Sequence, residues 1–192
     1  VSTRSGPAPT RTGVGITGKF WAHEHFVRPD IMTFGKKTQI CGFMCNTRID
    51  DVLENVFHKS SRINSTFGGN LIDMVRFAKI LEIIEEDGLV ENARVVGDHV
   101  MHQLQALEQD FPDMVSNARG RGLFCAVDLD SSQSRDLLKQ KAYEAGLILI
   151  GCGDHSIRFR PPLTLKKEEV DEGFSIIRKA LKEAELLYLA TD

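Results

Sequence analysis

The sequence predicts a chain of mixed helices and strands that ends in a small α+β domain, and three observations predict it. Apolar residues recur every three or four positions over 71–86, which indicates a long helix. A second run with this spacing extends from Leu89 to Leu107 and indicates an amphipathic helix. Beyond it the expected order is strand, helix, strand, strand, helix, which is typical of a small α+β domain.

Composition and charge exclude several classes of protein. The 192 residues are 42% hydrophobic and 27% charged, as in an ordinary globular protein rather than a disordered or fibrous one. The formal charge of −3 leaves no broad basic surface, so we expect no nucleic-acid partner. No apolar run approaches the roughly 18–20 residues of a membrane-spanning helix, so we expect no membrane segment.

The four cysteines are too few for a disulfide scaffold in a chain of this length. We therefore expect reduced thiols, which favours a cytoplasmic location. Cys41 and Cys45 stand four residues apart, but no Cys or His pair with zinc spacing follows them. We expect no metal site, and we assign the six histidines to structural or surface positions.

The first part of the chain is expected to hold a tail and two short strands. Residues 1–11 are rich in Ser, Thr, Pro and Arg, which indicates a tail without a role in the fold. Strands are expected at 31–34 and 39–45, and the first of them should be largely buried.

Two helices are expected next. A short one over 50–57 would bury Val52, Val56 and Phe57. The helix over 71–86 has such a wide apolar stripe that we expect it to lie inside the protein.

The last part of the chain alternates between expected helices and strands. The helix that starts at Leu89 should end before Phe111 and Pro112, since proline cannot continue a helix. Thr164 is expected to cap the last helix, and Arg-Gly-Arg-Gly at 119–122 is expected to form a turn. The remaining expected elements are a strand over 123–129, a helix over 132–145, and strands over 147–150 and 157–159.

Lys36 and Lys37 follow the strand expected at 31–34 and are candidates for amine chemistry. A lysine beside a buried strand loses part of its ammonium hydration, which favours the free amine that Schiff-base formation needs. The alternative is that both side chains extend into solvent. The spacing of the residues leaves both interpretations open.

The stretch Asn-Ser-Thr-Phe-Gly-Gly-Asn at 64–70 runs directly into the helix expected at 71–86. A helix N-terminus offers unpaired N–H groups and the positive end of the helix dipole, and the hydroxyls of Ser65 and Thr66 add donors. The segment is therefore a candidate phosphate site. The alternative is an ordinary N-terminal cap preceded by a flexible pair of glycines.

Arg158 and Arg160 alternate along an expected strand and should lie on the same face of it. Two guanidinium groups on one face, in a chain that is not basic overall, suit the bidentate capture of a carboxylate. Surface salt bridges are the alternative interpretation.

Five blocks of the sequence follow one another in a specific order. They are Thr-Gly-Val-Gly-Ile-Thr-Gly-Lys-Phe-Trp-Ala-His-Glu-His at 12–25, Asp-Ile-Met-Thr-Phe-Gly-Lys-Lys at 30–37, Asn-Ser-Thr-Phe-Gly-Gly-Asn at 64–70, Arg-Gly-Arg-Gly at 119–122 and Ser-Ile-Arg-Phe-Arg-Pro at 156–161. In this order they resemble the class III pyridoxal-phosphate-dependent aminotransferases. Within the family the chain is most similar to the branch of L-lysine 6-aminotransferases and 4-aminobutyrate aminotransferases, and the tracts 34–42 and 61–71 favour the lysine enzymes.

The resemblance implies an α/β fold of type I, of which this chain is expected to be the C-terminal portion. Residues 12–70 would be a remnant of the large cofactor-binding domain, 71–87 a linking helix and 88–192 the α+β small domain. The tail at 1–11 is unlike the family, and we expect a truncated or frame-altered reading frame. Apolar surface on residues 20–60 would then be exposed, which favours a homodimer or aggregation.

The resemblance also implies roles for individual residues. Lys36 would form the Schiff base with pyridoxal 5'-phosphate and move a proton between substrate and cofactor, with Lys37 as the neighbouring alternative. Thr66 would bind the cofactor phosphate of the partner subunit in a homodimer, with Asn64 close to it. The candidates for binding the α-carboxylate of the amino acid and of 2-oxoglutarate are Arg158 first and Arg160 second.

The implied activity, in lysine catabolism, is transfer of the terminal amino group of L-lysine to 2-oxoglutarate, giving glutamate and an aldehyde. The family carries Asp-Glu-Val-Gln before its Thr-Gly-x-Gly motif, and this Asp pairs with the pyridine nitrogen of the cofactor. Residues 8–11 here read Ala-Pro-Thr-Arg, so no carboxylate stands there and we expect weak or absent turnover. The alternatives are an aminotransferase for 4-aminobutyrate or another ω-amino acid, and a non-catalytic dimerisation or binding module.

Overall fold

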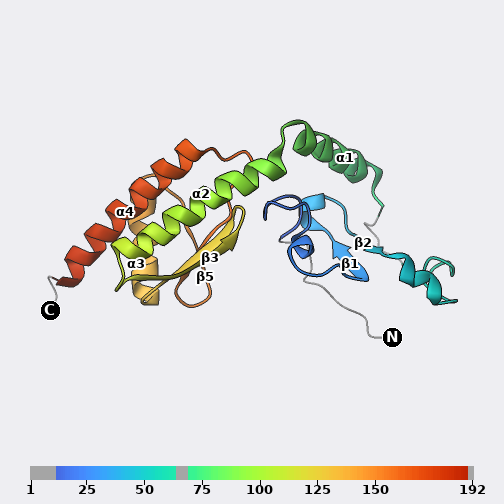
Figure 1. The fold of residues 1–192 in the computed structure, drawn as a ribbon, viewed down its shortest axis with the longest axis horizontal. Coiled ribbons are helices and arrows are strands. Elements are labelled where there is room, and N and C mark those ends of the chain that lie inside the picture. Colours follow the sequence, from blue (N-terminus) through green and yellow to red (C-terminus); the bar gives the residue numbers. More distant parts are fainter. Residues whose placement is uncertain (1–11, 64–68, 190–192) are drawn as a thin grey trace. The chain divides into compact units, whose positions relative to one another are not determined.

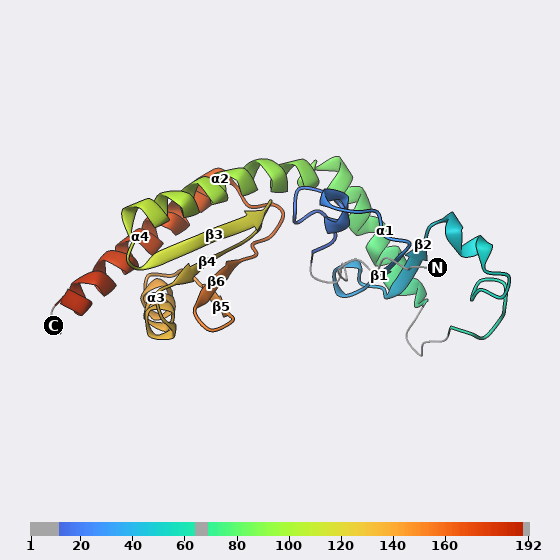
Figure 2. The same cartoon turned by 60° about the horizontal axis from the view of Figure 1, so that its bottom comes forward.

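The computed structural model describes residues 12–63 and 69–189, and the chain divides into two compact units. The first unit extends to Val90 and the second begins at Glu91. Figure 1 and Figure 2 show helices and two separate sheets among the described residues, so the mixed class expected from the sequence is confirmed. The tail expected at 1–11 lies outside the described residues.

The first unit holds a two-stranded antiparallel sheet in which Phe34 pairs with Gly42. The strand expected at 31–34 is confirmed, but the second strand starts three residues later than expected because residues 36–38 form a helical turn. The elements of this unit are η1 (Ala22–His25), β1 (Ile31–Phe34), η2 (Lys36–Thr38), β2 (Gly42–Cys45), η3 (Thr47–Asp51) and α1 (Leu71–Glu86).

The prediction of a helix at 50–57 is wrong, because the chain forms the 3-10 helix η3 and then a series of turns there. Asn55, which is buried, explains the turns: its side-chain amide donates to the carbonyl oxygens of Ile49 at 3.1 Å and Val52 at 3.0 Å. A polar side chain that bonds to nearby backbone in this way competes with helix formation. Val52 and Phe57, which were expected to be buried, are exposed.

The bounds expected for α1 are confirmed, but its expected place in the interior is wrong. The Asn70 side chain accepts the N–H of Ile72 at 3.0 Å and starts the helix. Ile84 is buried, whereas Leu71 is 75% and Val75 71% exposed. Apolar residues occur around most of the helix, and the described part of the first unit is too small to cover more than one side of it.

The second unit packs helices against a four-stranded antiparallel sheet with the strand order β3-β4-β6-β5. The helix expected from Leu89 is confirmed and ends at Asp110. The elements are α2 (Leu89–Asp110), β3 (Val115–Arg121), β4 (Phe124–Leu129), α3 (Ser132–Glu144), β5 (Ile150–Cys152), β6 (Ser156–Phe159) and α4 (Lys167–Leu189).

The core of this unit lies between one face of the sheet and the helices. Gly97 of α2 lies so close to the β3–β4 turn that a Cβ atom there would come within 2.1 Å of the Gly122 carbonyl carbon. This contact leaves room for glycine alone. The buried side chains of the core include Val96, Leu104 and Leu107 of α2, Val127 and Ile157 of the sheet, Leu138 of α3, and Phe174, Ile177 and Leu181 of α4.

Strand β3 was not expected from the sequence, which assigned the segment 119–122 to a turn. Arg119 and Arg121 lie in the strand, and Gly122 forms the turn with a φ of +54°. A β-bulge interrupts the pairing between Ser116 and Arg119, and Asn117 adopts a φ of +57° there. The bulge breaks the alternation of apolar and polar residues that would reveal a strand.

Two element ends also differ from expectation. Thr164 does not cap the last helix: α4 begins at Lys167, and the Glu169 carboxylate accepts the N–H of Lys166 at 2.8 Å. Strand β5 begins at Ile150 instead of Leu147, because the Leu147 N–H still bonds to the turn that ends α3. Among the described helices, none is long and apolar enough to cross a membrane.

Candidate functional site

Lys36 lies at the turn that joins β1 to β2. Its φ of +51° falls in the left-handed region, which residues with a Cβ atom rarely adopt. The Lys36 carbonyl oxygen accepts hydrogen bonds from the backbone N–H of Gln39 and from the Gln39 side-chain amide, each at 3.2 Å. Backbone held in a rare conformation by its surroundings is concentrated at functional sites.

The neighbours of Lys36 hold this turn from both sides. The ring of Phe34 lies over Gly42, where a Cβ atom would come within 2.5 Å of the ring. On the other side, Thr38 is 1% exposed and its hydroxyl donates to the carbonyl oxygen of Ile40 at 2.5 Å. The turn is therefore anchored in packed structure although it lies between two short strands.

The side chain of Lys36 is exposed, and Lys37 is half-buried. Within the described residues, the Lys36 ammonium group has no hydrogen bond or ion pair. The strand 31–34 was expected to be largely buried, and this is wrong: Met32 is buried but Ile31 is 42% exposed, since a two-stranded sheet buries one face. The Lys36 amine is accessible because of its place in the turn.

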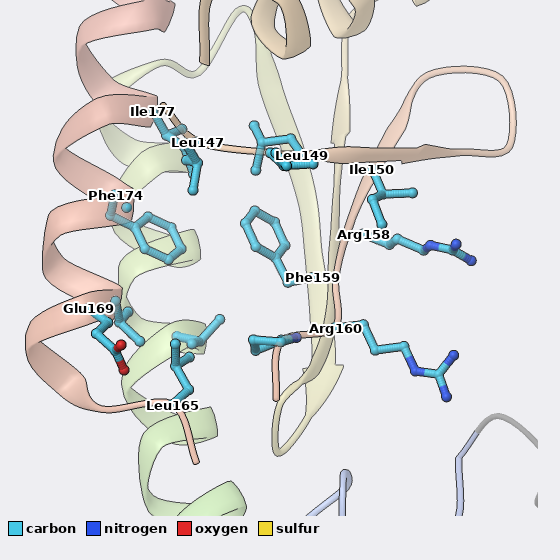
Figure 3. Close-up of a pocket in the computed structure, with 15 residues that line it drawn as sticks. Leu147, Leu149, Ile150, Arg158, Phe159, Arg160, Leu165, Glu169, Phe174 and Ile177 are labelled. Atoms are coloured by element: carbon cyan, nitrogen blue, oxygen red, sulfur yellow. The ribbon is translucent and has the colours of Figure 1, made fainter. Parts of the chain in front are cut away.

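Arg158 lies on β6, with Ala126 of β4 and Ile150 of β5 as its partners in the register. Figure 3 shows the side chains of Arg158 and Arg160 extending to the same side of the sheet, while Phe159 points to the opposite side, toward α4. The shared face expected from the alternation is therefore confirmed, and the roles of the two arginines stay predictions.

The Nε atom of Arg158 is buried and has no hydrogen-bond partner among the described residues. A buried N–H group without an acceptor is unfavourable by about 1–3 kcal/mol, so most such groups in folded proteins are satisfied. A carboxylate fits this donor, because the Nε and Nη groups of a guanidinium form a fork that matches its two oxygens. Arg158 thus has a buried donor group without an acceptor among the described residues.

A second charged cluster occupies the same face of the sheet. The Asp128 carboxylate accepts hydrogen bonds from Ser156 at 2.5 Å and Asn117 at 2.6 Å and pairs with Arg119 at 2.9 Å. Burial acts to raise the pKa of Asp128, but these hydrogen bonds and the charge of Arg119 outweigh it and lower the pKa to about 2. The sequence did not reveal this cluster, because its members come from three strands.

The pairing of Arg119 with Asp128 distinguishes Arg119 from Arg158. Arg119 and Arg158 both pair with Ala126 in the sheet register, so they lie on the same face. Asp128 neutralises Arg119, whereas Arg158 has no ion pair among the described residues. The positive charge of Arg158 on this face is therefore not neutralised by a carboxylate of the described residues.

A cavity of about 200 Å³ lies beside β6 and α4, and its lining includes Arg158 and Arg160 as well as Phe159. Figure 3 shows Phe159 and Phe174 side by side within it. Their ring centroids are 5.7 Å apart and the rings are inclined by 13°, which is a stacked arrangement. The cavity walls are mainly apolar and include Leu147, Leu149, Leu165 and Ile177.

Two of the residues proposed from the sequence, Asn64 and Thr66, lie outside the described residues. Lys36 belongs to the first unit, and Arg158 and Arg160 belong to the second. In the described ranges, no group of three or more His, Cys, Asp or Glu side chains is arranged to hold a metal ion.

Comparison with known proteins defines the class. Residues 10–181 match the model of the family described as aminotransferase class-III, so the chain belongs to the class III aminotransferases, a family that uses pyridoxal phosphate. The chain is similar to the L-lysine-epsilon aminotransferase of Mycobacterium tuberculosis, with 46% identity over 172 residues that cover 89% of this chain and 38% of that protein.

Other relatives agree with this assignment. The L-lysine-epsilon aminotransferase of Streptomyces clavuligerus is 44% identical over 173 residues, covering 89% of this chain and 38% of that protein. The 4-aminobutyrate aminotransferase of Bos taurus is 37% identical over 166 residues, covering 81% of this chain and 31% of that protein. A solved structure of lysine aminotransferase from M. tuberculosis matches with a TM-score of 0.87 and 45% identity over 91% of this chain and 40% of that one. The chain thus spans about two fifths of the length of the lysine enzymes that it matches.

Proposed function

We propose that this chain carries the cofactor-binding lysine and a substrate-binding arginine of an L-lysine 6-aminotransferase. The enzyme would transfer the terminal amino group of L-lysine to 2-oxoglutarate and release glutamate and an aldehyde. Identity of 44–46% to lysine-epsilon aminotransferases, against 36–37% to 4-aminobutyrate aminotransferases, supports lysine as the amino donor. The structural observation that carries the proposal is the exposed amine of Lys36 at its left-handed turn.

Lys36 fits pyridoxal 5'-phosphate because its primary amine is accessible and its backbone is held by the turn. When bound, the cofactor supplies an electron-withdrawing ring that takes up the electron pair left on the substrate carbon after deprotonation. The Lys36 amine, once released by the incoming amino group, would carry that proton to and from the substrate carbon. Lys37, which is half-buried, is the alternative for this role.

Arg158 would hold the α-carboxylate of the amino acid and of 2-oxoglutarate. The partnerless Nε atom supports this role, since a carboxylate would supply the missing acceptor. Arg160, which extends on the same side of the sheet, is the second candidate.

A fold-type I architecture and a homodimer belong to the same proposal. Residues 12–70 would form part of the large cofactor domain, 71–87 a linking helix and 88–192 the small domain. In the dimer, Thr66 would bind the cofactor phosphate of the partner subunit, with Asn64 beside it. Exposed apolar side chains such as Leu71 of α1 support an association of this kind. A cytoplasmic location is also proposed, because a reducing compartment suits the four free cysteines.

Turnover by this chain is expected to be weak or absent. The segment before Thr12 ends in Arg11 and contains no carboxylate to pair with the pyridine nitrogen of the cofactor. An arginine near that nitrogen would disfavour its protonated form and weaken the ring as an electron acceptor. Measurable formation of glutamate from lysine and 2-oxoglutarate would contradict this part of the proposal.

Cofactor attachment is the direct test. The purified chain, mixed with pyridoxal phosphate, should show an absorbance band shifted from that of the free cofactor. Borohydride reduction and peptide mapping should then place the label on Lys36. Lys36→Ala should abolish the specific label, and Lys37→Ala is the matched control that should retain it. Label scattered over surface lysines, with Lys36 at background, would overturn the proposal for this chain.

A further inference from the structure

Arg158 is the last residue of β6 with a partner on both sides, because Phe159 after it pairs with Cys125 of β4 but with no residue of β5. The strand ends at Phe159, and Pro161 and Pro162, which have no N–H to donate to a neighbouring strand, follow almost at once. On its outer side β6 is paired with β5, an edge strand of three residues. The end of the strand at Phe159 is therefore held by β4 on one side and by what packs on it from the helix side of the sheet.

Phe159 makes that contact through its stack with Phe174 of α4. Phe174 is 3% exposed, and its ring lies nearly parallel to that of Phe159 with the centroids 5.7 Å apart. Since successive side chains of a strand point to opposite faces, fixing Phe159 on one face also fixes the direction of Arg158 on the other. Figure 3 shows this arrangement, with the stacked rings on one side of β6 and the arginine on the other.

The cavity beside the rings makes the stack more important. Its volume of about 200 Å³ lies between Phe159, Phe174 and the segment 147–150. This hollow is partly open to solvent, so on that side the rings have no protein side chain packed against them. The restraint on Phe159 therefore comes to a greater extent from Phe174 than it would in a fully packed core.

We infer that the Phe159–Phe174 stack positions Arg158 for carboxylate binding, and that Phe174 is a positioning residue for the site. Phe174 touches no substrate and acts through Phe159 and the backbone of β6. The inference rests on the proposed function, in which Arg158 binds the carboxylate. The inference adds Phe174, a residue of α4, to the residues that support that site.

The test is a titration of the labelled chain with 2-oxoglutarate, followed through the NMR signal of the Arg158 Nε–H group. The wild-type signal should shift in a saturable way, with a Kd on the order of 1 mM for a single guanidinium contact. Phe174→Leu keeps an apolar side chain but removes the ring, and it should weaken binding roughly tenfold while the chain stays folded. The Arg158 Nε–H should also exchange faster with water in this variant. Phe174→Tyr keeps the ring and should restore binding to within about twofold of the wild type.

Two further variants separate the possible outcomes. Val96→Ala creates a small void in α2 at a residue that does not itself line the cavity, and should leave 2-oxoglutarate affinity within about twofold of the wild type. Arg158→Gln lacks the observed group, so this variant is followed through the methylene signals of 2-oxoglutarate, whose saturable broadening by the wild-type chain it should abolish. Equal affinity of the wild type and Phe174→Leu, or an equal loss in Val96→Ala, would overturn the positioning role alone. A wild-type chain that does not respond to 2-oxoglutarate would overturn the carboxylate role of Arg158, and the positioning role with it.

Discussion

Helices α1 and α2 follow one another in the chain with two residues between them, but their apolar side chains are buried to very different extents. Leu71 and Val75 of α1 are 75% and 71% exposed, whereas Ala93 and Leu104 of α2 are fully buried. Both helices have the bounds that their sequence pattern indicates. The difference teaches that periodicity predicts a helix, while burial depends on the layer that covers it.

The two units supply layers of different size. In the second unit, α2 belongs to a core that includes a four-stranded sheet and two further helices. In the first unit, the described sheet consists of two strands of four residues each. A two-stranded sheet buries little apolar area, so α1 keeps an exposed apolar surface that the spacing of its residues would place inside.

A matched pair of leucine substitutions should produce the largest difference between these helices. Leu104→Ala removes a side chain that is 0% exposed and should lower the free energy of unfolding of the second unit by about 2–5 kcal/mol. Leu71→Ala should change stability by less than about 0.5 kcal/mol when the chain is monomeric. Urea denaturation followed by circular dichroism, combined with hydrogen exchange of the α1 amides for the first unit and of the β4 amides for the second, measures both. Equal losses for the two variants would show that α1 is covered after all.

Each unit also contains an aspartate that accepts hydrogen bonds from an asparagine and an arginine. The two aspartates should differ in how much they contribute to the free energy of unfolding. Asp128→Asn disrupts a cluster on the four-stranded sheet and should cost about 1–3 kcal/mol at pH 7. Asp30, which accepts from Asn46 and Arg48 at 2.8 Å each, belongs to the smaller sheet. Asp30→Asn should cost about 0–1 kcal/mol, since half of the Arg48 side chain is exposed.

The pH dependence follows from the lowered pKa of Asp128. A carboxyl group whose pKa falls from 3.8 to about 2 on folding adds stability at pH values above 3.8. That stability is lost as the pH falls through the window from about 4 to 2, because protonation then removes the charge that Arg119 pairs with. Urea midpoints measured between pH 5 and pH 2 should therefore decline less steeply for Asp128→Asn than for the wild type. The same slope in both proteins would refute this assignment.

The smallest effect should be a gain in stability on α4. A Cβ atom at Gly173 would meet the Leu147 side chain at 3.8 Å, which is an ordinary contact, and would extend into the cavity. Gly173→Ala should therefore stabilise the chain by about 0.5–1 kcal/mol through its helix propensity. Gly97→Ala is the matched control on α2 and should destabilise, because its Cβ would collide with the backbone at Gly122. Thermal unfolding of both variants distinguishes propensity from packing, and a loss of stability in Gly173→Ala would contradict the prediction.

Some elements could be predicted from the sequence because their signals are local. Helix α1 begins after the cap Asn70 and ends before Gly88, and both signals can be read from neighbouring residues. Strand β3 could not be predicted, because its bulge between Ser116 and Arg119 breaks the alternation on which a strand prediction depends. The helix expected at 50–57 failed because one buried asparagine, Asn55, reorganises the backbone around it.

Some features of the candidate site could likewise be predicted from a local pattern, and others could not. The alternation of Arg158, Phe159 and Arg160 was enough to place the two arginines on one face. The partnerless Nε of Arg158 and the stack of Phe159 on Phe174 depend on residues far apart in the chain, so no local pattern reveals them. The roles of Lys36, Asn64 and Thr66 stay predictions. The cofactor experiment tests the role of Lys36.

By itself the sequence determined the mixed class and the positions of the long helices, because these depend on residue types at short spacing, and its ordered motifs carried the resemblance to the family. Only the tertiary structure decided which apolar faces are covered. It also decided that Asp128 pairs with Arg119, and that Phe174 of α4 stacks on Phe159, the neighbour of Arg158 in its strand. The physical reason is that burial, ion pairing and ring stacking are set by distances between segments that only the fold brings together.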